Sequence, residues 1–555
     1  MTGVGAFLEI LHRSGVRYIF GNPGTTELPI NDALACDDRF RYILGLHEIP
    51  VTAMADGYSM ASGRLGVVNV HICCGLGNAM GMIYNAHIEG SPILVVAGQQ
   101  DRRLVLGGPV LGGDMLSVVR PWVKWACEVH RVEDVPNATR RAIQTAMTPP
   151  TGPVFLSLPL DLQTEAATGL DLRPASLPDR RIRPGIESIR QAAAMLAGAK
   201  NPAILAGSRV AESDACGRLA ELAEQLGVPV YSECNTSHGR LPLPADHPLY
   251  LGALPLWTPD VRKLLEPHDI LLVVGMNLLR LYIWQESDPP ISASTRIIHL
   301  DVDPAEIGKN YPVDVGMIGD LREGLHELSA TLEPMLASAQ QRRAKEQIAS
   351  FRQVRAKQQH DLQSKINAEK EIRPMTAAVL MDCIAKSAPP EIAFIEEATT
   401  TNQHLLERLG VLKDPKALFA HRGWALGWGI GCALGVKLAW PDRPVLGLIG
   451  DGASLYGIQG LWSAARYRIP VTFIIANNTQ YKILKVCGDM LPLPEMQKRN
   501  YLGMDLTGPE IDFGGLARSF GVEAHRVSEP DELIERLRNS WSRSDALLLD
   551  VPIER

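Results

Sequence analysis

The sequence predicts an α/β protein made of three domains, each built around a parallel sheet. Three observations predict this class. Short apolar runs rich in Val, Ile and Leu alternate with longer helix-like patterns, which is typical of βαβ units. At 555 residues, the chain is long enough for about three cores. A helix–proline–strand pattern at 81–96 returns at 460–475, which suggests duplicated outer domains around a distinct middle one.

Two connecting stretches divide the chain into residues 1–170, 185–330 and 373–555. The first connection, 173–184, is rich in Pro and Arg, as expected of an irregular linker. The second, at about 336–370, is a charged and Gln-rich helical run, most simply a solvated connecting helix. The block between them repeats the alternation of helix patterns and apolar strands.

Composition and charge exclude several classes of protein. A net charge of −7 with a pI near 6.1 argues against nucleic acid or an anionic membrane as the main partner. The sequence has no run of about 20 uncharged apolar residues and no secretion signal at its start, so we expect a cytoplasmic protein. Its nine cysteines contain no CxxC pair that would indicate zinc or redox chemistry.

The most informative motif lies in the third domain. Gly450-Asp451-Gly452 is followed, after 24 residues, by Asn477-Asn478. Residues 444–449 predict an apolar strand, 453–467 a helix and 471–475 a second buried strand. Both strands of such a βαβ unit end at the same edge of the sheet, so Asp451 and Asn478 are expected to converge in the crevice there.

A carboxylate and an amide oxygen at that edge suit a hard cation. Mg²⁺ prefers octahedral oxygen ligands and usually completes its shell with phosphate oxygens and water. The flanking glycines let backbone N–H groups approach a phosphate at the start of a helix. The motif therefore predicts a Mg²⁺ ion bridged to a diphosphate, which is the pattern of thiamine-diphosphate enzymes.

Thiamine chemistry also needs a carboxyl group in the first domain. The cofactor's own 4′-imino group removes the C2 proton only if a carboxyl group hydrogen-bonds N1′ of the pyrimidine. Glu48 is the candidate, because it follows the apolar run 42–46 and precedes a helix that contains 53–59. An acid that merely caps the start of a helix is the alternative interpretation.

Runs of residues at both ends of the chain carry a family resemblance. The chain resembles the decarboxylase and acetolactate-synthase superfamily, and within it the benzoylformate decarboxylases, in the runs Phe20-Gly21-Asn22-Pro23-Gly24-Thr25-Thr26-Glu27-Leu28-Pro29, Asp56-Gly57-Tyr58, Gly77-Asn78-Ala79-Met80-Gly81 and Ala97-Gly98-Gln99-Gln100. The resemblance spans nearly the whole chain and is looser in the middle domain. It implies that the first domain binds the pyrimidine of the cofactor and the third its diphosphate.

The resemblance also implies a metal site and an activating acid. Glu48 matches the glutamate at N1′. Asp451 and Asn478 match the side-chain ligands of Mg²⁺, and Gln480 matches the residue whose backbone carbonyl is the third protein ligand.

Further positions match contacts with the cofactor. Leu426 matches the bulky residue that bends the cofactor, and Trp424 occupies a place, usually a glycine, whose carbonyl receives the 4′-amino group. Thr399 and Thr400 match hydroxyls that meet the diphosphate. The other candidate cofactor contacts are Asn22, Gly24, Asn78, Gly450, Gly452, Ala453, Tyr481 and Ile483.

The substrate side departs from the benzoylformate decarboxylase pattern. His71 matches the first relay histidine near C2, and Thr25 stands where a serine meets the substrate carboxylate. Tyr282 takes the place of the second relay histidine. A phenol with a pKa near 10 donates a hydrogen bond but is a poor proton shuttle at pH 7. The catalytic candidates are therefore Glu48, His71, Thr25 and Tyr282.

These residues predict non-oxidative decarboxylation of a 2-oxo acid to CO₂ and an aldehyde. The alternative is a carboligase resembling acetolactate synthase or benzaldehyde lyase, which forms 2-hydroxyketones and which Tyr282 favours. A protein that binds the cofactor without catalysis would be expected to lose Glu48. A Rossmann-type dehydrogenase would need G-x-G-x-x-G, which Gly75–Gly81 lacks.

The resemblance finally implies an assembly. In this family, the domains that carry Glu48 and the metal motif face each other across subunits, so we expect at least a homodimer and more specifically a homotetramer. FAD is not expected, although the turn at 206–210 is a weak nucleotide signal that a plain strand–helix connection explains equally well.

Overall fold

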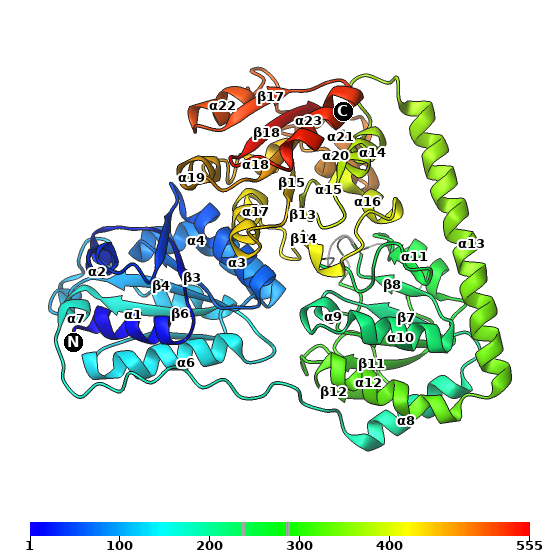
Figure 1. The fold of residues 1–555 in the computed structure, drawn as a ribbon, viewed down its shortest axis with the longest axis horizontal. Coiled ribbons are helices and arrows are strands. Elements are labelled where there is room, and N and C mark those ends of the chain that lie inside the picture. The colour runs from blue at the N-terminus through cyan, green and yellow to red at the C-terminus, as the bar shows by residue number, and fades with distance from the viewer. Residues whose placement is uncertain (235–238, 281, 283, 285, 287–288) are drawn as a thin grey trace.

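The computed structural model describes residues 1–234, 239–280, 282, 284, 286 and 289–555. Their strands form three six-stranded sheets, in each of which neighbouring strands are parallel (Figure 1). The predicted α/β class is therefore confirmed. The domain limits at 170, 185, 330 and 373 stay predictions.

The first sheet has the strand order β2-β1-β3-β4-β6-β5. Its central strands are buried along their whole length because helices cover both faces, and such strands are continuously apolar. The strands are β1 (Tyr18–Asn22), β2 (Arg41–Leu44), β3 (Gly66–Val70), β4 (Ile93–Gln99), β5 (Trp125–Glu128) and β6 (Val154–Pro159). The helices are α1 (Gly3–Arg13), α2 (Leu28–Ala35), α3 (Glu48–Ser62), α4 (Ile72–Glu89), α5 (Met115–Val119), α6 (Val135–Met147) and α7 (Leu160–Thr164).

The third sheet repeats the strand succession of the first, in the order β14-β13-β15-β16-β18-β17. The duplication predicted from the helix–proline–strand pattern is thus confirmed at the level of topology. The strands are β13 (Ala393–Glu397), β14 (Leu418–Ala420), β15 (Val445–Gly450), β16 (Thr472–Asn477), β17 (Glu523–Arg526) and β18 (Leu547–Pro552). The helices are α14 (Ala377–Ser387), α15 (Thr399–Asn402), α16 (Leu405–Arg408), α17 (Trp428–Ala439), α18 (Asp451–Ser454), α19 (Gly460–Tyr467), α20 (Lys482–Met490), α21 (Pro494–Gln497), α22 (Phe513–Ser519) and α23 (Pro530–Ser540).

One predicted element of this domain is wrong. The single helix expected at 453–467 is two helices, α18 and α19, with residues 455–459 between them. A Cβ on Gly457 would lie only 2.3 Å from the carbonyl oxygen of Gly427. The chain leaves the helix there because residue 457 packs directly on the backbone of a distant loop.

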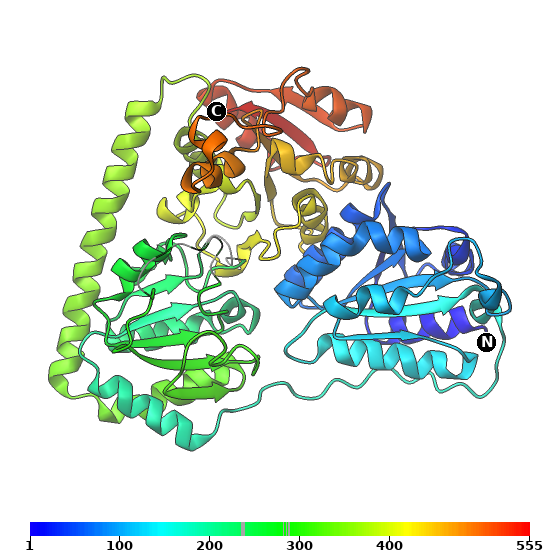
Figure 2. The same cartoon turned by 180° about the vertical axis from the view of Figure 1, so that it is seen from behind.

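The second sheet has the order β12-β11-β10-β7-β8-β9, so its strand order reverses between β7 and β10. Its strands are β7 (Ala203–Ala206), β8 (Val230–Ser232), β9 (Tyr250–Ala253), β10 (Ile270–Val274), β11 (Arg296–Asp301) and β12 (Val315–Ile318). Its helices are α8 (Ile186–Gly198), α9 (Arg209–Glu212), α10 (Cys216–Leu226), α11 (Thr258–Leu265) and α12 (Leu321–Leu332). The predicted connecting helix is α13 (Ser338–Glu369), which runs along the outer edge of the molecule to the third sheet (Figure 2).

Helices α3 and α17 join the first domain to the third. A Cβ on Gly57 would lie 2.4 Å from the carbonyl oxygen of Cys432, so the two helix backbones touch there. Nε1 of Trp428 donates to Oδ2 of the buried Asp56 at 2.7 Å. Among the described residues, no helix is both long and apolar enough to cross a bilayer.

Candidate active site

Glu48 and Asn78 meet between two helices of the first domain. Glu48 opens α3 and is 6% exposed. Nδ2 of Asn78, on α4, donates to Oε2 of Glu48 at 3.0 Å. A Cβ on Gly75 would lie 2.6 Å from Oε1, so the carboxylate packs directly on the backbone of α4. The acid is thus held at a fixed place on the carboxyl edge of the sheet.

His71 lies at the same edge, where β3 passes into α4. Its Nδ1 is 3.0 Å from Oε2 of Glu27, whose side chain is completely buried. A Cβ on Gly24 would lie 1.6 Å from Nδ1, so only glycine leaves room for the ring. Thr25 follows Gly24 and is exposed. The structure therefore brings His71 and Gly24 together and leaves Thr25 at the surface of the described chain.

Glu27 is a residue that our sequence reasoning missed as a site residue. Its carboxylate accepts from the backbone N–H groups of Gly24, Ile72 and Gly98, at 3.0, 3.1 and 2.7 Å. An acid three residues after Gly24, within the run that carries the family resemblance, was the available signal. Asn22, at the end of β1, donates from Nδ2 to the carbonyl oxygen of Gly45 at 3.1 Å and so joins the ends of β1 and β2.

Asp451 and Asn478 follow neighbouring parallel strands, as predicted. Gly450, at the end of β15, pairs with Ala476 of β16. Oδ1 of Asp451 accepts from the N–H of Gly452 at 2.8 Å, and Oδ1 of Asn478 accepts from the N–H of Gln480 at 3.1 Å. Burial raises the pKa of Asp451 to about 6, and nearby backbone N–H groups oppose this shift.

The surroundings of the second carboxylate oxygen of Asp451 show whether a cation would fit here. Oδ2 is buried and has no hydrogen-bond partner among the described residues. Burying a carboxylate oxygen without a hydrogen-bond donor costs free energy unless a cation binds to it. In the part of the chain that the structure describes, no group of three His, Cys, Asp or Glu side chains could hold a metal. A cation here would therefore depend on the mixed carboxylate, amide and carbonyl set.

The predicted diphosphate residues gather at the same edge of the third sheet. Thr399 and Thr400 open α15 directly after β13, which pairs with β15. A Cβ on Gly452 would lie 2.4 Å from Cε1 of Tyr481, so the tyrosine ring covers this glycine. Ala453 is buried in α18, and Ile483 is half-buried in the first turn of α20.

The loop before α17 carries Trp424 and Leu426 and is held from two sides. Glu397 accepts from the N–H groups of Gly427, Trp428 and Gly429 at 2.8, 3.0 and 2.8 Å, and burial raises its pKa to about 8. Asn85 of α4 donates to the carbonyl of Ala425 at 2.9 Å and accepts from its N–H at 3.1 Å. Sequence reasoning missed Glu397 and Asn85, because no local pattern links them to this loop.

Tyr282 lies beside Trp424, at two positions where the resemblance implies a histidine and a glycine. The two rings stack with centroids 5.7 Å apart and an interplanar angle of 25°. Trp424 has a φ of +64°, in the left-handed region that non-glycine residues seldom occupy. This backbone suits the glycine that the resemblance implies at this position. The tyrosine is 45% exposed, so it lies at the surface beside the loop.

The predicted residues thus form two groups in one chain. The side-chain hydrogen bonds described above for Asn22, Glu48 and His71 stay within the first domain, and those of Asp451 and Asn478 stay within the third. The contacts described between the two domains run instead through α3 and α17, and through α4 and the loop before α17.

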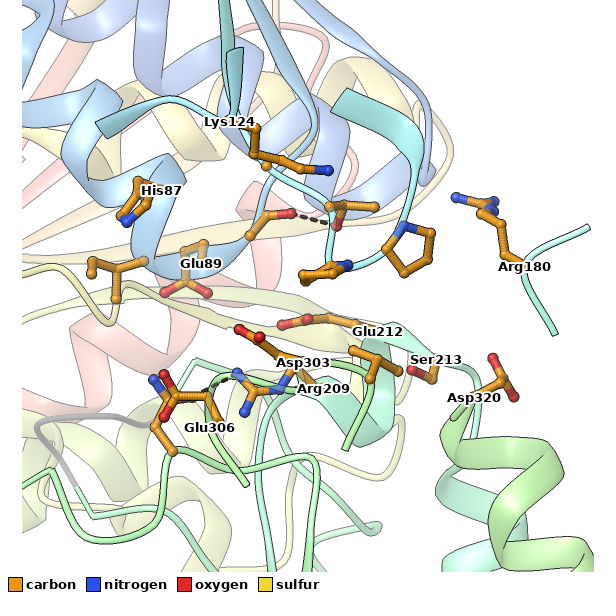
Figure 3. A pocket seen from close by; sticks show the side chains of 18 of the residues that line it. His87, Glu89, Lys124, Arg180, Arg209, Glu212, Ser213, Asp303, Glu306 and Asp320 are labelled. Carbon is orange, nitrogen blue, oxygen red and sulfur yellow. Dashed lines mark hydrogen bonds between the residues drawn. The ribbon is translucent and has the colours of Figure 1, made fainter. Parts of the chain in front are cut away.

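A cavity of about 880 Å³ lies elsewhere, between the first and second domains (Figure 3). Its lining contains none of the predicted site residues. Arg209, in the turn with the weak nucleotide signal, lines it but already donates to Asn277 at 2.6 Å and to Asp301 at 2.7 Å. The expectation about FAD stays a prediction.

Comparison with known proteins accounts for all three domains. The chain matches the thiamine pyrophosphate (thiamine diphosphate) enzyme family in its N-terminal binding domain at residues 1–115, its central domain at 189–328 and its C-terminal binding domain at 399–551. It is 34% identical over 551 residues to the benzoylformate decarboxylase of Pseudomonas aeruginosa, covering 99% of this chain and 98% of that protein. It is 29% identical over 573 residues to a probable acetolactate synthase large subunit of Methanocaldococcus jannaschii, covering 100% and 92%.

Solved structures agree with these relatives. Benzoylformate decarboxylase from Polynucleobacter necessarius superposes with a TM-score of 0.87 at 28% identity, covering 100% of this chain and 98% of that one. A 4-hydroxybenzoylformate decarboxylase from Rhodococcus jostii gives 0.86 at 30%, covering 100% and 99%. Matched in every domain and along nearly its whole length, the chain belongs to the thiamine-diphosphate-dependent enzymes, the family of the benzoylformate decarboxylases and acetolactate synthases.

Proposed function

We propose that this enzyme decarboxylates a 2-oxo acid without oxidation and releases an aldehyde. The observation that carries the proposal is the placing of Glu48 and Asp451 at the carboxyl edges of two sheets with the same topology. The 34% identity to a benzoylformate decarboxylase supports this reaction class over others in the family.

The metal and cofactor residues fit the groups assigned to them. Asp451 and Asn478 would hold Mg²⁺ through side-chain oxygens, with Gln480 contributing its backbone carbonyl, and the unpartnered Oδ2 of Asp451 supports this. Gly450, Gly452 and Ala453 would bring backbone N–H groups to the diphosphate, beside Thr399 and Thr400. When bound, thiamine diphosphate supplies the carbanion and the electron sink that decarboxylation needs.

The protein's own groups would orient the reactants and move protons. Glu48, held by Asn78, would keep a proton at N1′ of the pyrimidine. Leu426 would support the bent cofactor, because Glu397 and Asn85 fix the peptides on either side of it. His71 would exchange a proton through Nε2, since its Nδ1 is bound to Glu27. Thr25 would meet the substrate carboxylate with its hydroxyl.

A specific observation favours a second candidate function, carboligation to a 2-hydroxyketone. Tyr282, half-exposed beside Trp424, stands where the resemblance calls for a relay histidine. Burial raises the pKa of its phenol further, so it delivers a proton poorly at neutral pH. Slow protonation would leave more time for a second carbonyl compound to react.

We also propose an active homodimer and, more specifically, a homotetramer in the cytoplasm. The supporting observation is that the Glu48 and Asp451 groups are not linked by the hydrogen bonds described for them in one chain. A second chain would place its third domain against the edge of the first domain that carries Thr25 and His71.

One experiment tests the proposed function directly. Protein with thiamine diphosphate and Mg²⁺ is incubated with benzoylformate, phenylpyruvate, pyruvate and 2-oxobutanoate, with and without an added aldehyde, and products are identified by mass spectrometry. Free aldehyde as the main product supports the decarboxylase and names its substrate class. A dominant 2-hydroxyketone supports the carboligase. No turnover of any 2-oxo acid by folded protein loaded with the cofactor contradicts both.

A further inference from the structure

Lys485 lies against the loop that contains two of the predicted metal ligands. Its Nζ donates to Oε1 of Gln480 at 2.6 Å and to Oδ1 of Asp505 at 2.8 Å. The same ammonium lies 5.1 Å from the centre of the Tyr501 ring, within range of a cation–π contact. The Lys485 side chain is only 17% exposed. Both partners and the ring thus surround a largely buried cation.

The stability of helix α20 does not explain this arrangement. Lys485 is in the first turn of a helix that begins at Lys482, where the helix dipole disfavours a cation. The ion pair with Asp505 would contribute little by itself, because the aspartate side chain is 46% exposed. The second partner, Gln480, is 6% exposed and is a neutral amide. The contacts of the ammonium with Gln480 and its loop therefore account for its position.

Asp505 belongs to a segment that pairs with the ligand loop. Gln480 and Asp505 form an antiparallel bridge. The N–H of Tyr481 donates to the carbonyl of Met504, and the N–H of Leu506 to that of Thr479, each at 2.8 Å. Thr479 has a φ of +55°, an uncommon conformation for threonine that the surrounding structure must maintain.

We propose that Lys485 is a positioning residue for the metal site. It ties the Gln480 side chain to Asp505 and so clamps the 504–506 segment onto the 479–481 loop. That loop sets the direction of the Gln480 carbonyl and, through the bond from the Gln480 N–H, of the Asn478 side chain. The inference rests on the proposed Mg²⁺ site and goes beyond it, because it names a residue outside the ligand set that controls metal affinity.

Arg555 offers a matched control. Its Nη2 donates to the same Oδ1 of Asp505 at 2.7 Å. Arg555→Met therefore removes an ion pair from Asp505 and leaves the Lys485 bond to Gln480 in place. Lys485→Met removes both bonds, and Lys485→Arg keeps a cation with donors for both acceptors.

The test measures metal binding instead of turnover. Mn²⁺ is titrated in place of Mg²⁺ into full-length protein with saturating thiamine diphosphate, and free Mn²⁺ is followed by electron paramagnetic resonance. Lys485→Met is expected to weaken Mn²⁺ binding by roughly 10- to 100-fold, the usual effect of losing a residue that orients metal ligands. Lys485→Arg should recover most of this loss, and Arg555→Met should bind Mn²⁺ as the wild type does. Metal-free hydrogen exchange should show faster exchange of the Tyr481 and Leu506 amides in Lys485→Met.

Two results would overturn the inference: wild-type Mn²⁺ affinity in Lys485→Met, or an equal loss in Arg555→Met. Asp505→Ala, at a side chain that is 46% exposed, removes the acceptor and replaces Lys485→Met if the latter does not fold. Unchanged Mn²⁺ affinity in that variant also counts against the clamp. Failure of the wild type to bind Mn²⁺ with the cofactor would contradict the proposed function itself, which distinguishes the two failures.

Discussion

Nδ1 of His71 lies 3.0 Å from Oε2 of Glu27, whose side chain is completely buried. The same carboxylate accepts from the backbone of three segments, at Gly24, Ile72 and Gly98. These three backbone donors hold the carboxylate in place without the histidine. Because a carboxylate only accepts hydrogen bonds, the proton sits on Nδ1 and Nε2 is available for exchange.

Glu27→Gln is expected to lower kcat by roughly 10- to 100-fold, as loss of an orienting partner commonly does. The amide can donate to Nδ1 and so favours the other tautomer, with the proton on Nε2. The variant should bind thiamine diphosphate as the wild type does. Steady-state kinetics with Glu27→Gln, His71→Asn and the double variant check the coupling. A further loss when Glu27→Gln is added to His71→Asn would show that Glu27 acts by another route.

Glu48→Gln and Asp451→Asn should each be inactive, for different reasons. The first should retain the cofactor but lose exchange of the C2 proton, and the second should lose metal-dependent cofactor binding. If each active site combines two chains, co-expression of both variants should restore about a quarter of the wild-type activity, because half of random dimers contain one intact site. Absence of restored activity in isolated mixed dimers would contradict the shared site.

Tyr282→His should shift the products toward free aldehyde. An imidazole with a pKa near neutral donates a proton at pH 7, whereas a phenol retains it. Proton transfer from a positioned side chain accelerates a reaction by roughly 100-fold or more. Tyr282→Phe is the control, because it keeps an aromatic ring against Trp424 and removes only the hydroxyl. The ratio of aldehyde to 2-hydroxyketone, measured by mass spectrometry, shows whether the products have shifted. An equal ratio in Tyr282→His and Tyr282→Phe would rule out a role for proton delivery at this position.

Asp56 predicts a pH dependence of stability. It is completely buried between α3 and α17, and burial raises its pKa to about 7, while the bond from Trp428 opposes the shift. An unfolded Asp titrates at about 3.9, so between these values the folded state binds the proton more tightly and the free energy of unfolding falls as pH rises. The contribution is complete below about pH 4 and is lost by about pH 7.

Asp56→Asn removes this titration and preserves an acceptor for Trp428. Relative to the wild type, the variant is expected to gain stability between pH 5 and pH 7, on the order of 1 kcal/mol per pH unit. Thermal unfolding midpoints of both proteins at pH 5 and pH 8 measure the change. A difference between the two proteins that is the same at both pH values would count against the buried, protonated acid.

The parts of the site that could be predicted from sequence are those whose geometry is local. Gly450-Asp451-Gly452 and Asn477-Asn478 flank one βαβ unit, and the parallel pairing of β15 with β16 brings their ends together whatever the rest of the chain does. Continuous apolar strands likewise predict buried parallel sheets. The repeated topology of the outer domains follows from the repeated order of helix, proline and strand.

Tertiary structure decided the contacts between residues that are distant in the chain. Glu27 with His71, Asn85 with Ala425, Glu397 with Gly427 and Lys485 with Asp505 are joined only once sheets and loops have packed. The break between α18 and α19 has the same origin, in the contact of Gly457 with Gly427. The period of a helix or strand tells which face a side chain is on, but not which distant backbone that face will meet. The residue types at the proposed cofactor and metal site are thus local features of the sequence, whereas the groups that hold those side chains in place were determined by packing.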